Sequence, residues 1–441
     1  MALTSKVLTI GPESIFTSQG NNAITTMYVC NTSNAAAQFS MYAVPSGQTA
    51  TNDKLMYYQV PLAAGDTYVI DSEKLVLGPG DALYASVIDP VLVATQGLAD
   101  TGWGANAEVY TAYWSSDRSE YIVGGAGGKV AVSQTGEDWE YISELSTLGW
   151  TGNVNVNSIT RAPYQKYLVV GDSGWMATSS DGVNWENAAV LRSSAWGVTD
   201  VYAAANNGSV YIIVGASGKI ATSTNAVDWT LRTQLQTTGW STSDIWSVIW
   251  DGDRFVIGGE GGKIAYSADG ETWTYVNSLA TNLAWGAATR VNALVYSGSP
   301  AAGYLAVTRD SNRAATSVDG NTWVYSNGLA TIGTSGTPGS ASAVYRPGYG
   351  FYVLGLTPKV YKLSSLGTWT VQNSDLLNLP WNSQTGYDLV WNPDRAEFLA
   401  VGADASVATS QEAVLWTYRT TSDTANVSLP NVVVTVSSIG I

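Results

Sequence analysis

A tryptophan recurs seven times in the larger, C-terminal part of the chain, at intervals of 44 to 50 residues. Six residues before most of these tryptophans stands a serine, and the best-preserved copies read SSDGVNW, SADGETW and SVDGNTW. A fixed period of this length indicates repeated supersecondary units that stack on one another. The seven positions are Trp139, Trp185, Trp229, Trp273, Trp323, Trp369 and Trp416.

Each repeat reads as four short strands. In the fourth copy, residues 244–250, 255–259, 263–267 and 273–277 are rich in β-branched and aromatic residues, and Gly, Asp and Asn fill the turns between them. One such meander cannot bury both of its faces, so copies must pack together, and a ring of blades also protects the sheet edges. The repeat therefore predicts an all-β chain with a seven-bladed propeller of four-stranded blades over residues 98–420.

The serine-to-tryptophan motif has a structural interpretation. An aspartate can accept backbone N–H bonds in a tight turn, the next glycine tolerates a positive φ, and the serine hydroxyl can join the same turn. The tryptophan would open the last strand and bury a large apolar area. The motif residues of the three best copies are Ser179, Asp181, Gly182, Trp185, Ser267, Asp269, Gly270, Trp273, Ser317, Asp319, Gly320 and Trp323.

This motif, S-x-D-G-x-x-W, resembles the Asp-box of sialidase-type propellers. The longer pattern G-x-x-G-K-I-A-x-S-x-D-G-x-x-W is similar to the propellers of photosystem assembly factors. The resemblance covers about 317 residues. It implies the fold, but no particular function, because Asp-boxes occur in enzymes, lectins and scaffolds alike.

Two further positions repeat and are candidate ligand sites. A tryptophan precedes the first strand of six repeats, and a basic residue stands ten residues before the motif tryptophan in five. Aromatic and basic groups on one face could bind an anionic glycan. The alternative is structural, with tryptophans wedged between blades and the basic groups solvated or lying over rings. The candidates are Trp103, Trp150, Trp196, Trp240, Trp285, Trp381, Lys129, Lys219, Lys263, Arg313 and Lys359.

Residues 1–97 contain no tryptophan and no copy of the motif. Alternating runs separated by Gly- and Asp-rich turns predict a β-sandwich of six to eight strands, among them 24–31, 37–45 and 82–88. The order ITTMYVCNTSNAAAQFSMYAV, VPLAAGDTYVID, LVLGPGDALYAS resembles a small domain of tailed-bacteriophage virion proteins. That resemblance implies a virion-anchoring domain.

The last segment, 421–441, is a strand-like tail that the seven repeats do not need. Three placements stay open: pairing with the first domain, closing the propeller ring as an extra strand, or contacting a neighbouring subunit.

Composition narrows the possible functions. The net charge of −15 disfavours nucleic acid and anionic membrane surfaces as partners. With no histidine and a single cysteine, Cys30, we expect no metal site, no cofactor and no disulfide. The N-terminal apolar run is too short for a signal peptide, and no run is long enough to span a membrane.

We therefore expect a non-enzymatic virion structural protein, assembled in the host cytoplasm. Its partners would be other virion proteins and a host-surface glycan, and its state a homo-oligomer, a trimer by analogy. The runner-up is a photosystem-assembly-type scaffold. The third hypothesis is a sialidase-like hydrolase, for which the sequence offers arginines and acids without the family's signature. The arginines are Arg161, Arg254, Arg290 and Arg395; the acids are Asp172, Glu260, Asp310 and Asp404.

Overall fold

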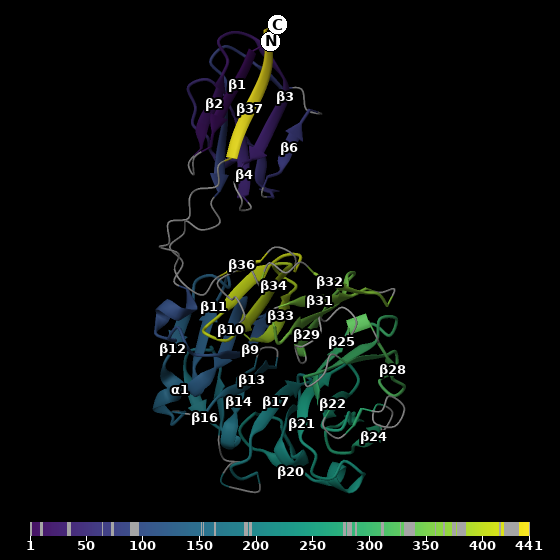
Figure 1. Ribbon diagram of the computed structural model, residues 1–441. Helices are drawn as coiled ribbons and strands as arrows, with labels where there is room; N and C mark the ends of the chain where they lie inside the picture. Colours follow the sequence, from purple (N-terminus) through teal and green to yellow (C-terminus); the bar gives the residue numbers. More distant parts are fainter. Residues whose placement is uncertain are drawn as a thin grey trace. The chain divides into compact units, whose positions relative to one another are not determined.

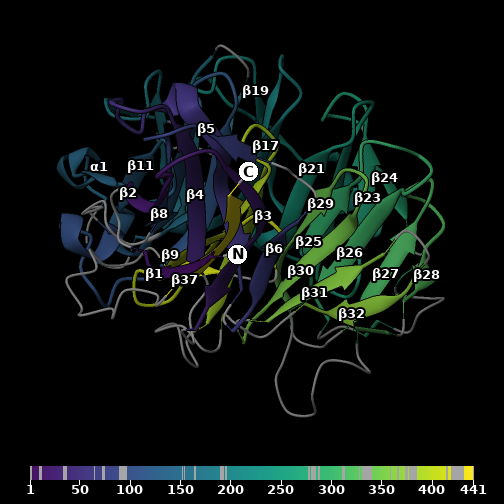
Figure 2. The ribbon, with the colours of Figure 1, turned by 90° about the horizontal axis from the view of Figure 1, so that it is seen from above.

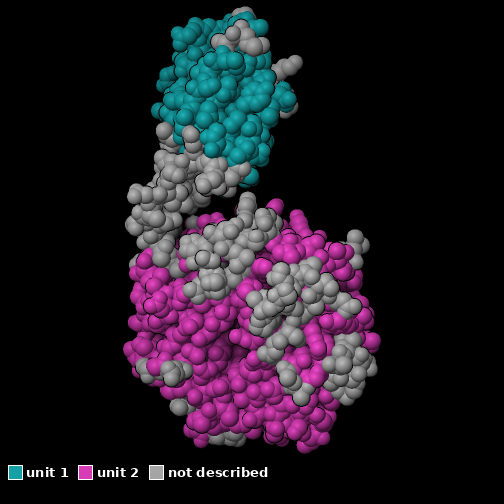
Figure 3. Space-filling model, in the orientation of Figure 1, with its two compact units in different colours: residues 1–94, 423–441 teal, residues 95–422 magenta. Residues whose placement is uncertain are grey.

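The computed structural model describes the chain apart from residues 1, 9–11, 33–36, 64, 72–74, 89–96, 151, 153, 163–164, 189–192, 194–195, 277–278, 280–284, 287–288, 310–312, 327, 330–339, 358, 365–366, 373–375, 377–384, 414–415, 419–431 and 441. The chain forms two compact units (Figure 3). Unit 1 comprises residues 1–94 and 423–441, and unit 2 comprises residues 95–422. Within the described residues, no helix is long and apolar enough to cross a membrane.

Unit 1 consists of two antiparallel sheets that share one core. In β3, Ile24, Met27 and Val29 are buried while Tyr28 is exposed, because successive side chains of a strand point to opposite faces. The first sheet contains β1 (Ala2–Val7), β37 (Val432–Gly440), β3 (Asn22–Asn31) and β6 (Thr67–Ile70) in that order, with β7 (Leu75–Leu77) also beside β3. The second contains β2 (Glu13–Thr17), β8 (Ala82–Ile88), β4 (Ala37–Val44) and β5 (Leu55–Leu62).

The C-terminal strand β37 lies between β1 and β3, so that it is an interior strand of unit 1 (Figure 1). Val432, Val434 and Val436 are buried in the core of this unit. Of the three placements left open for the tail, the structure shows pairing with the first domain. Unit 2 is thus inserted between strands of unit 1.

The described part of unit 2 contains seven four-stranded antiparallel sheets, each formed by four consecutive strands. The first strands are β9 (Val109–Ser115), β13 (Val156–Arg161), β17 (Val201–Asn206), β21 (Ile245–Trp250), β25 (Val291–Tyr296), β29 (Ser340–Arg346) and β33 (Gly386–Asn392). The second are β10 (Glu120–Gly125), β14 (Tyr167–Gly171), β18 (Tyr211–Gly215), β22 (Phe255–Gly259), β26 (Tyr304–Thr308), β30 (Gly350–Gly355) and β34 (Glu397–Gly402).

The third strands are β11 (Val130–Ser133), β15 (Met176–Ser179), β19 (Ile220–Ser223), β23 (Ile264–Ser267), β27 (Ala314–Ser317), β31 (Val360–Leu363) and β35 (Val407–Ser410). The fourth are β12 (Glu140–Ile142), β16 (Trp185–Asn187), β20 (Thr230–Arg232), β24 (Thr274–Val276), β28 (Val324–Tyr325), β32 (Trp369–Val371) and β36 (Thr417–Tyr418). Short helical turns connect them, among them α1 (Glu144–Thr147) and η7 (Gln234–Thr237). The expected all-β fold class is confirmed.

The seven sheets are arranged in a closed ring. Each first strand contacts the first strand of the next sheet, and β33 of the last sheet contacts β9 of the first. The first strands therefore surround the central axis, and we call them the inner strands. Figure 2 shows the order outward for β25 to β28, which run from the middle of unit 2 to its rim.

Side chains rather than a shared strand close the ring between the last sheet and the first. Asp388 in β33 accepts the backbone N–H of Ala112 in β9 at 2.9 Å, and the Asn392 amide donates to the Tyr121 hydroxyl at 2.9 Å. Leu399 and Val401 share one core cluster with the first sheet. Closure thus depends on buried polar groups as well as apolar contact.

We expect the stability of this closure to depend on pH through Asp388. Burial raises the pKa of its carboxyl above the ordinary value. A carboxyl with a raised folded-state pKa favours folding while it is protonated, and that contribution is lost as the pH rises from about 4 through the folded-state pKa. Asp388→Asn has no charge and keeps one acceptor oxygen for Ala112, but it loses the acceptor for the Leu389 N–H. Its stability relative to the natural protein should therefore rise between pH 4 and pH 8, whatever the difference is at pH 4. Urea midpoints of both proteins at pH 4 and pH 8 test this. A variant whose stability relative to the natural protein falls between pH 4 and pH 8 would contradict it.

Candidate functional site

The Asp-box motif forms a tight turn between the third and fourth strands. In the fourth sheet, the N–H groups of Glu271 and Thr272 donate to Asp269 Oδ1 at 2.8 Å each, and Gly270 N–H donates to Ser267 Oγ at 2.8 Å. Trp273 Nε1 donates to the Gly270 carbonyl at 3.2 Å. The hydrogen bonds, above all that from Thr272, hold the pKa of Asp269 at about 2. The copies around Asp181 and Asp319 make the same bonds.

These turns contact the preceding sheet. A Cβ added at Gly270 would lie 3.1 Å from Thr222 Cγ2 of the third sheet, and one at Gly182 would lie 3.5 Å from Val132 Cγ1 of the first. Gly182 and Gly270 have φ values of +79° and +74°, which favour glycine. The motif therefore joins neighbouring sheets. In the third sheet, Ala226 takes the glycine position at φ +59° and is buried.

The tryptophans before the inner strands, which we call the linker tryptophans, are not ligand platforms. Their side chains are 0–1% exposed, so no ligand can stack on them. Trp240 Nε1 donates to the Ser243 carbonyl at 2.8 Å, and its ring lies against Gly259, where an added Cβ would be 2.5 Å away. The glycan-binding interpretation of these residues is corrected to a packing role. The buried set is Trp103, Trp150, Trp196, Trp240 and Trp285; Trp381 lies outside the described residues.

The repeated lysines bind those same linkers. Lys263 Nζ donates to the Trp240 carbonyl at 2.7 Å and to Ser243 Oγ at 2.8 Å. Lys129 and Lys219 donate in the same way to the carbonyls of Trp103 and Trp196. Burial lowers the pKa of all three lysines. Each lysine thus stabilises the linker of its own sheet, in agreement with the structural alternative, while anion binding by these three stays a prediction. Arg313 and Lys359 stand at the same repeat position and are partly buried.

A different set of residues meets at the axis. Every inner strand has a β-bulge at its second residue, where the register to the second strand shifts by one. Bulges re-aim a side chain and concentrate next to functional sites. We call these seven residues the bulge ring. It consists of Tyr110, Asn157, Tyr202, Trp246, Asn292, Ala341 and Tyr387.

Six members of the bulge ring keep partly exposed side chains, and the aromatic ones pair across neighbouring sheets. Tyr202 and Trp246 stack with ring centroids 4.0 Å apart and planes inclined by 12°. The Arg290 guanidinium lies 4.6 Å from the centroid of the Trp246 ring. Tyr110 and Tyr387 meet edge to face at 5.0 Å across the seam where the ring closes.

Carboxylates surround these aromatic groups. Burial and the nearby Glu108 raise the pKa of Tyr110 to about 12, and burial with Asp244 and Asp200 raises the pKa of Tyr202. Several of the acids also fix the adjacent turns, since Asp244 Oδ1 accepts the Ser217 N–H at 2.7 Å. The acids acting on these tyrosines are Glu108, Asp172, Asp200, Asp244, Glu260 and Asp404. Two arginines also lie among these groups, since Arg290 lies over Trp246 and Arg309 acts on Tyr110 and Tyr387. The bulge ring is therefore aromatic, with more acids than bases around it.

The arginines considered for a hydrolase lie apart. Arg290 immediately precedes an inner strand, at the end that carries the bulge ring, whereas Arg161 ends an inner strand and is paired with Asp117. Arg254 and Arg395 follow inner strands, at the same end as Arg161. Asp172, Glu260 and Asp404 are near the bulge ring, and Asp310 lies outside the described residues. In the described part of the chain, no group of three or more His, Cys, Asp or Glu residues could hold a metal ion.

The bulge ring was not predicted, because its residues do not repeat from one sheet to the next. A signal exists in five of the seven inner strands, in the residue just after the first Val or Ile, as in EVY, NVN, DVY and DIW. The inner strands that begin at Ser340 and Gly386 lack it. Among these five strands that position is Tyr, Asn or Trp, while the residue before it is always Val or Ile. Variation on a constant framework is what a ligand site requires, whereas a folding role calls for the same residue in every copy.

Comparison with known proteins identifies the fold. No family model matches the chain, and no curated protein matches it. Among solved structures, YCF48 bound to D1 peptide is 13% identical with a TM-score of 0.51, covering 69% of this chain and 93% of that one. YCF48 from Cyanidioschyzon merolae is 16% identical with a TM-score of 0.52, covering 70% and 96%. The extracellular domain of BT4673 from B. thetaiotaomicron is 13% identical with a TM-score of 0.53, covering 72% and 39%.

These neighbours are β-propeller proteins, so unit 2 has a β-propeller fold, as the repeat predicted. At such low identities the similarity defines the fold and leaves the function to the site.

Proposed function

We propose that this protein is a non-enzymatic binding protein whose propeller holds a basic, extended segment of a protein partner at the bulge ring. The observation that carries the proposal is the stacked Tyr202–Trp246 pair within a group of carboxylates. Aromatic faces attract cations through their quadrupole, and carboxylates add charge and hydrogen-bond acceptors. Since Tyr202 and Arg290 already lie against the Trp246 ring, a basic ligand would contact the exposed part of this pair and the carboxylates around it.

The amides of the bulge ring are engaged within the protein. Asn157 Nδ2 donates to Asp172 Oδ1 at 2.8 Å and to the Val201 carbonyl at 3.0 Å, and Asn292 donates to the Ala341 carbonyl. These donors are therefore not available to a ligand of either kind, and a ligand would contact the aromatic rings and carboxylates instead. A YCF48 propeller of the same fold has been solved with a peptide bound, which supports a polypeptide ligand.

Within this proposal the seven sheets are seven blades, and unit 1 is a β-sandwich that attaches the propeller to a larger assembly. The resemblance of residues 24–86 to a domain of tailed-phage virion proteins supports a virion as that assembly, built in the host cytoplasm. The partner segment would then belong to another virion protein or to the host surface. A photosystem-assembly-type scaffold would also bind its protein partner at the bulge ring.

The proposal is tested by titrating the full chain with ten-residue peptides of basic, neutral and acidic composition, read by fluorescence anisotropy. We expect basic peptides to bind, more weakly at higher salt, and Trp246→Ala to lower their affinity at least tenfold. Glu186→Gln, which removes a carboxylate from an exposed ion pair with Lys166, is the control and should change nothing. Equal affinity for acidic peptides, or full affinity in Trp246→Ala, would refute the proposal. If the protein bound a glycan array and Trp246→Ala abolished that binding, the ligand of the bulge ring would be a sugar instead of a peptide.

A further inference from the structure

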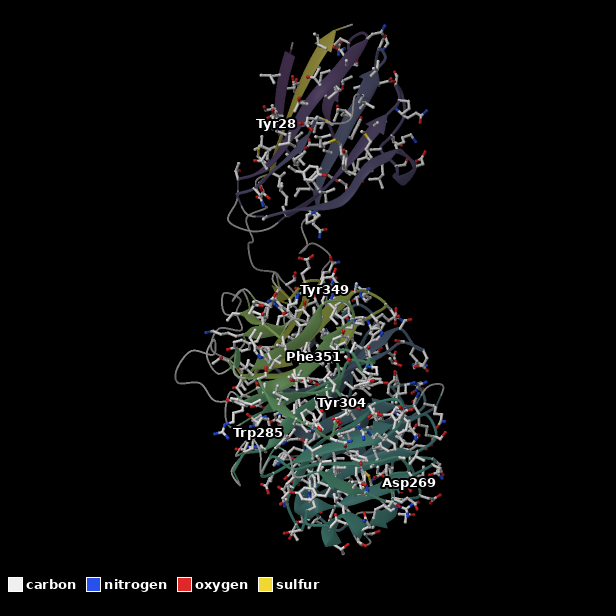
Figure 4. All side chains as sticks on the ribbon, turned by 90° about the vertical axis from the view of Figure 1, so that its right-hand side faces the viewer. Tyr28, Asp269, Trp285, Tyr304, Tyr349 and Phe351 are labelled. Carbon is white, nitrogen blue, oxygen red and sulfur yellow. The ribbon has the colours of Figure 1, made fainter. Side chains whose placement is uncertain are left out.

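The first sheet of unit 1 has an outer face that no described element covers. Tyr28, Val69 and Val76 point away from the shared core and are 42%, 45% and 61% exposed, while their strand neighbours Met27 and Ile70 are buried. Figure 4 labels Tyr28 on this sheet. The outward residues fixed by the strand register are Leu3, Ser5, Val7, Ala23, Thr26, Tyr28, Cys30, Thr67, Val69, Val76, Val433, Thr435 and Ile439. Ser437 is also outward by register, but it is buried and accepts a hydrogen bond from Thr25 Oγ1 at 3.1 Å.

None of these outward residues is charged, although the chain as a whole carries a net charge of −15. Their polar members are small and partly paired with one another, since Ser5 Oγ and Thr435 Oγ1 are 2.8 Å apart and Thr67 donates to Cys30 Sγ at 3.1 Å. Monomeric proteins rarely expose an apolar patch of this breadth without a partner. The face is thus suited to burial.

We propose that this face packs against the same face of a second copy of the chain, about a twofold axis. Two copies with this net charge repel one another over most of their surface, and an uncharged face is where they can meet without like-charge contact. A flat sheet is also self-complementary, and isologous contacts of this kind generate closed dimers.

The size of the face fits a weak dimer. The strands β1, β37, β3, β6 and β7 hold 6, 9, 10, 4 and 3 residues. At a strand spacing of about 4.8 Å and about 3.4 Å per residue they give a face of roughly 520 Å². Two copies would bury about 1,000 Å² in total, which is the size of a weak, concentration-dependent interface. Because a single sheet face pairs two copies and no more, the expected state is a dimer rather than the trimer expected by analogy.

Sedimentation velocity of the full chain between about 1 and 100 µM tests the proposal. We expect the natural protein to shift from 46.5 kDa toward twice that mass, and Tyr28→Glu with Val69→Glu to stay monomeric. Val198→Glu with Val318→Glu is the matched control, because those valines of unit 2 are 69% and 66% exposed and lie outside the face. This control should dimerise like the natural protein. A natural protein that stays monomeric, a trimer, or a Tyr28→Glu/Val69→Glu variant that still dimerises would overturn the proposal.

Cys30 provides a second measurement without any substitution, because the chain's single cysteine lies on this face. Its reaction with a bulky maleimide should slow at least fivefold as the protein concentration rises through the dimerisation range. A rate that does not depend on concentration would also overturn the proposal.

Discussion

Trp240→Ala is expected to lower the free energy of unfolding by about 3–5 kcal/mol without changing peptide affinity. Trp240 is completely buried between the linker and the fourth sheet, and it holds the loop through its bond to the Ser243 carbonyl. Removing the indole leaves a cavity next to Gly259 and deprives Lys263 of a fixed carbonyl partner. Urea unfolding followed by far-ultraviolet circular dichroism measures the loss.

Trp246→Ala is the matched comparison, because Trp246 is partly exposed and six residues away in the chain. We expect a smaller stability loss and the tenfold loss of peptide affinity described above. The two tryptophans thus separate packing from binding. If Trp240→Ala abolished binding in samples that remain folded, the linker tryptophans would have to be reinstated as part of the site.

The repeat predicted the blade strands closely because each contact within a blade is local. The predicted strand at 255–259 is β22 with the same bounds, and the strand predicted at 244–250 is β21 one residue shorter. In unit 1 the strand predicted at 82–88 is β8. Alternating apolar residues and turn chemistry define such elements within a short stretch of chain.

The long-range pairing was not predictable in the same way. β37 pairs with β1 and β3 across more than 400 residues, and nothing in NVVVTVSSIGI specifies which sheet it joins. The site was missed for a related reason. A bulge depends on the register between two strands, so the side-chain direction of Tyr202 or Trp246 follows from backbone pairing and not from residue type.

The largest electrostatic effect is expected for the pair Arg161 and Asp117, which joins the first two sheets. Arg161 Nε lies 3.1 Å from Asp117 Oδ2 and Nη2 lies 3.0 Å from the same oxygen, and the guanidinium stacks 4.4 Å from the Tyr167 ring centroid. The two side chains are 6% and 14% exposed. A buried ion pair is costly to break on one side only, because the remaining charge keeps its desolvation penalty.

Arg161→Met should therefore cost about 3–5 kcal/mol of unfolding free energy, whereas adding Asp117→Leu should recover most of that loss. The exposed pair Lys166 and Glu186 serves as control, since Lys166→Met should cost less than about 1 kcal/mol. Urea midpoints of the single and double variants give the coupling energy. Additive losses in the double variant would mean that Arg161 acts through its stacking on Tyr167 and not through Asp117. A large coupling energy between Arg161 and Asp117 would instead show that the ion pair itself stabilises the contact between the first two sheets. It would do so in addition to the Asp-box turns, which already join neighbouring sheets.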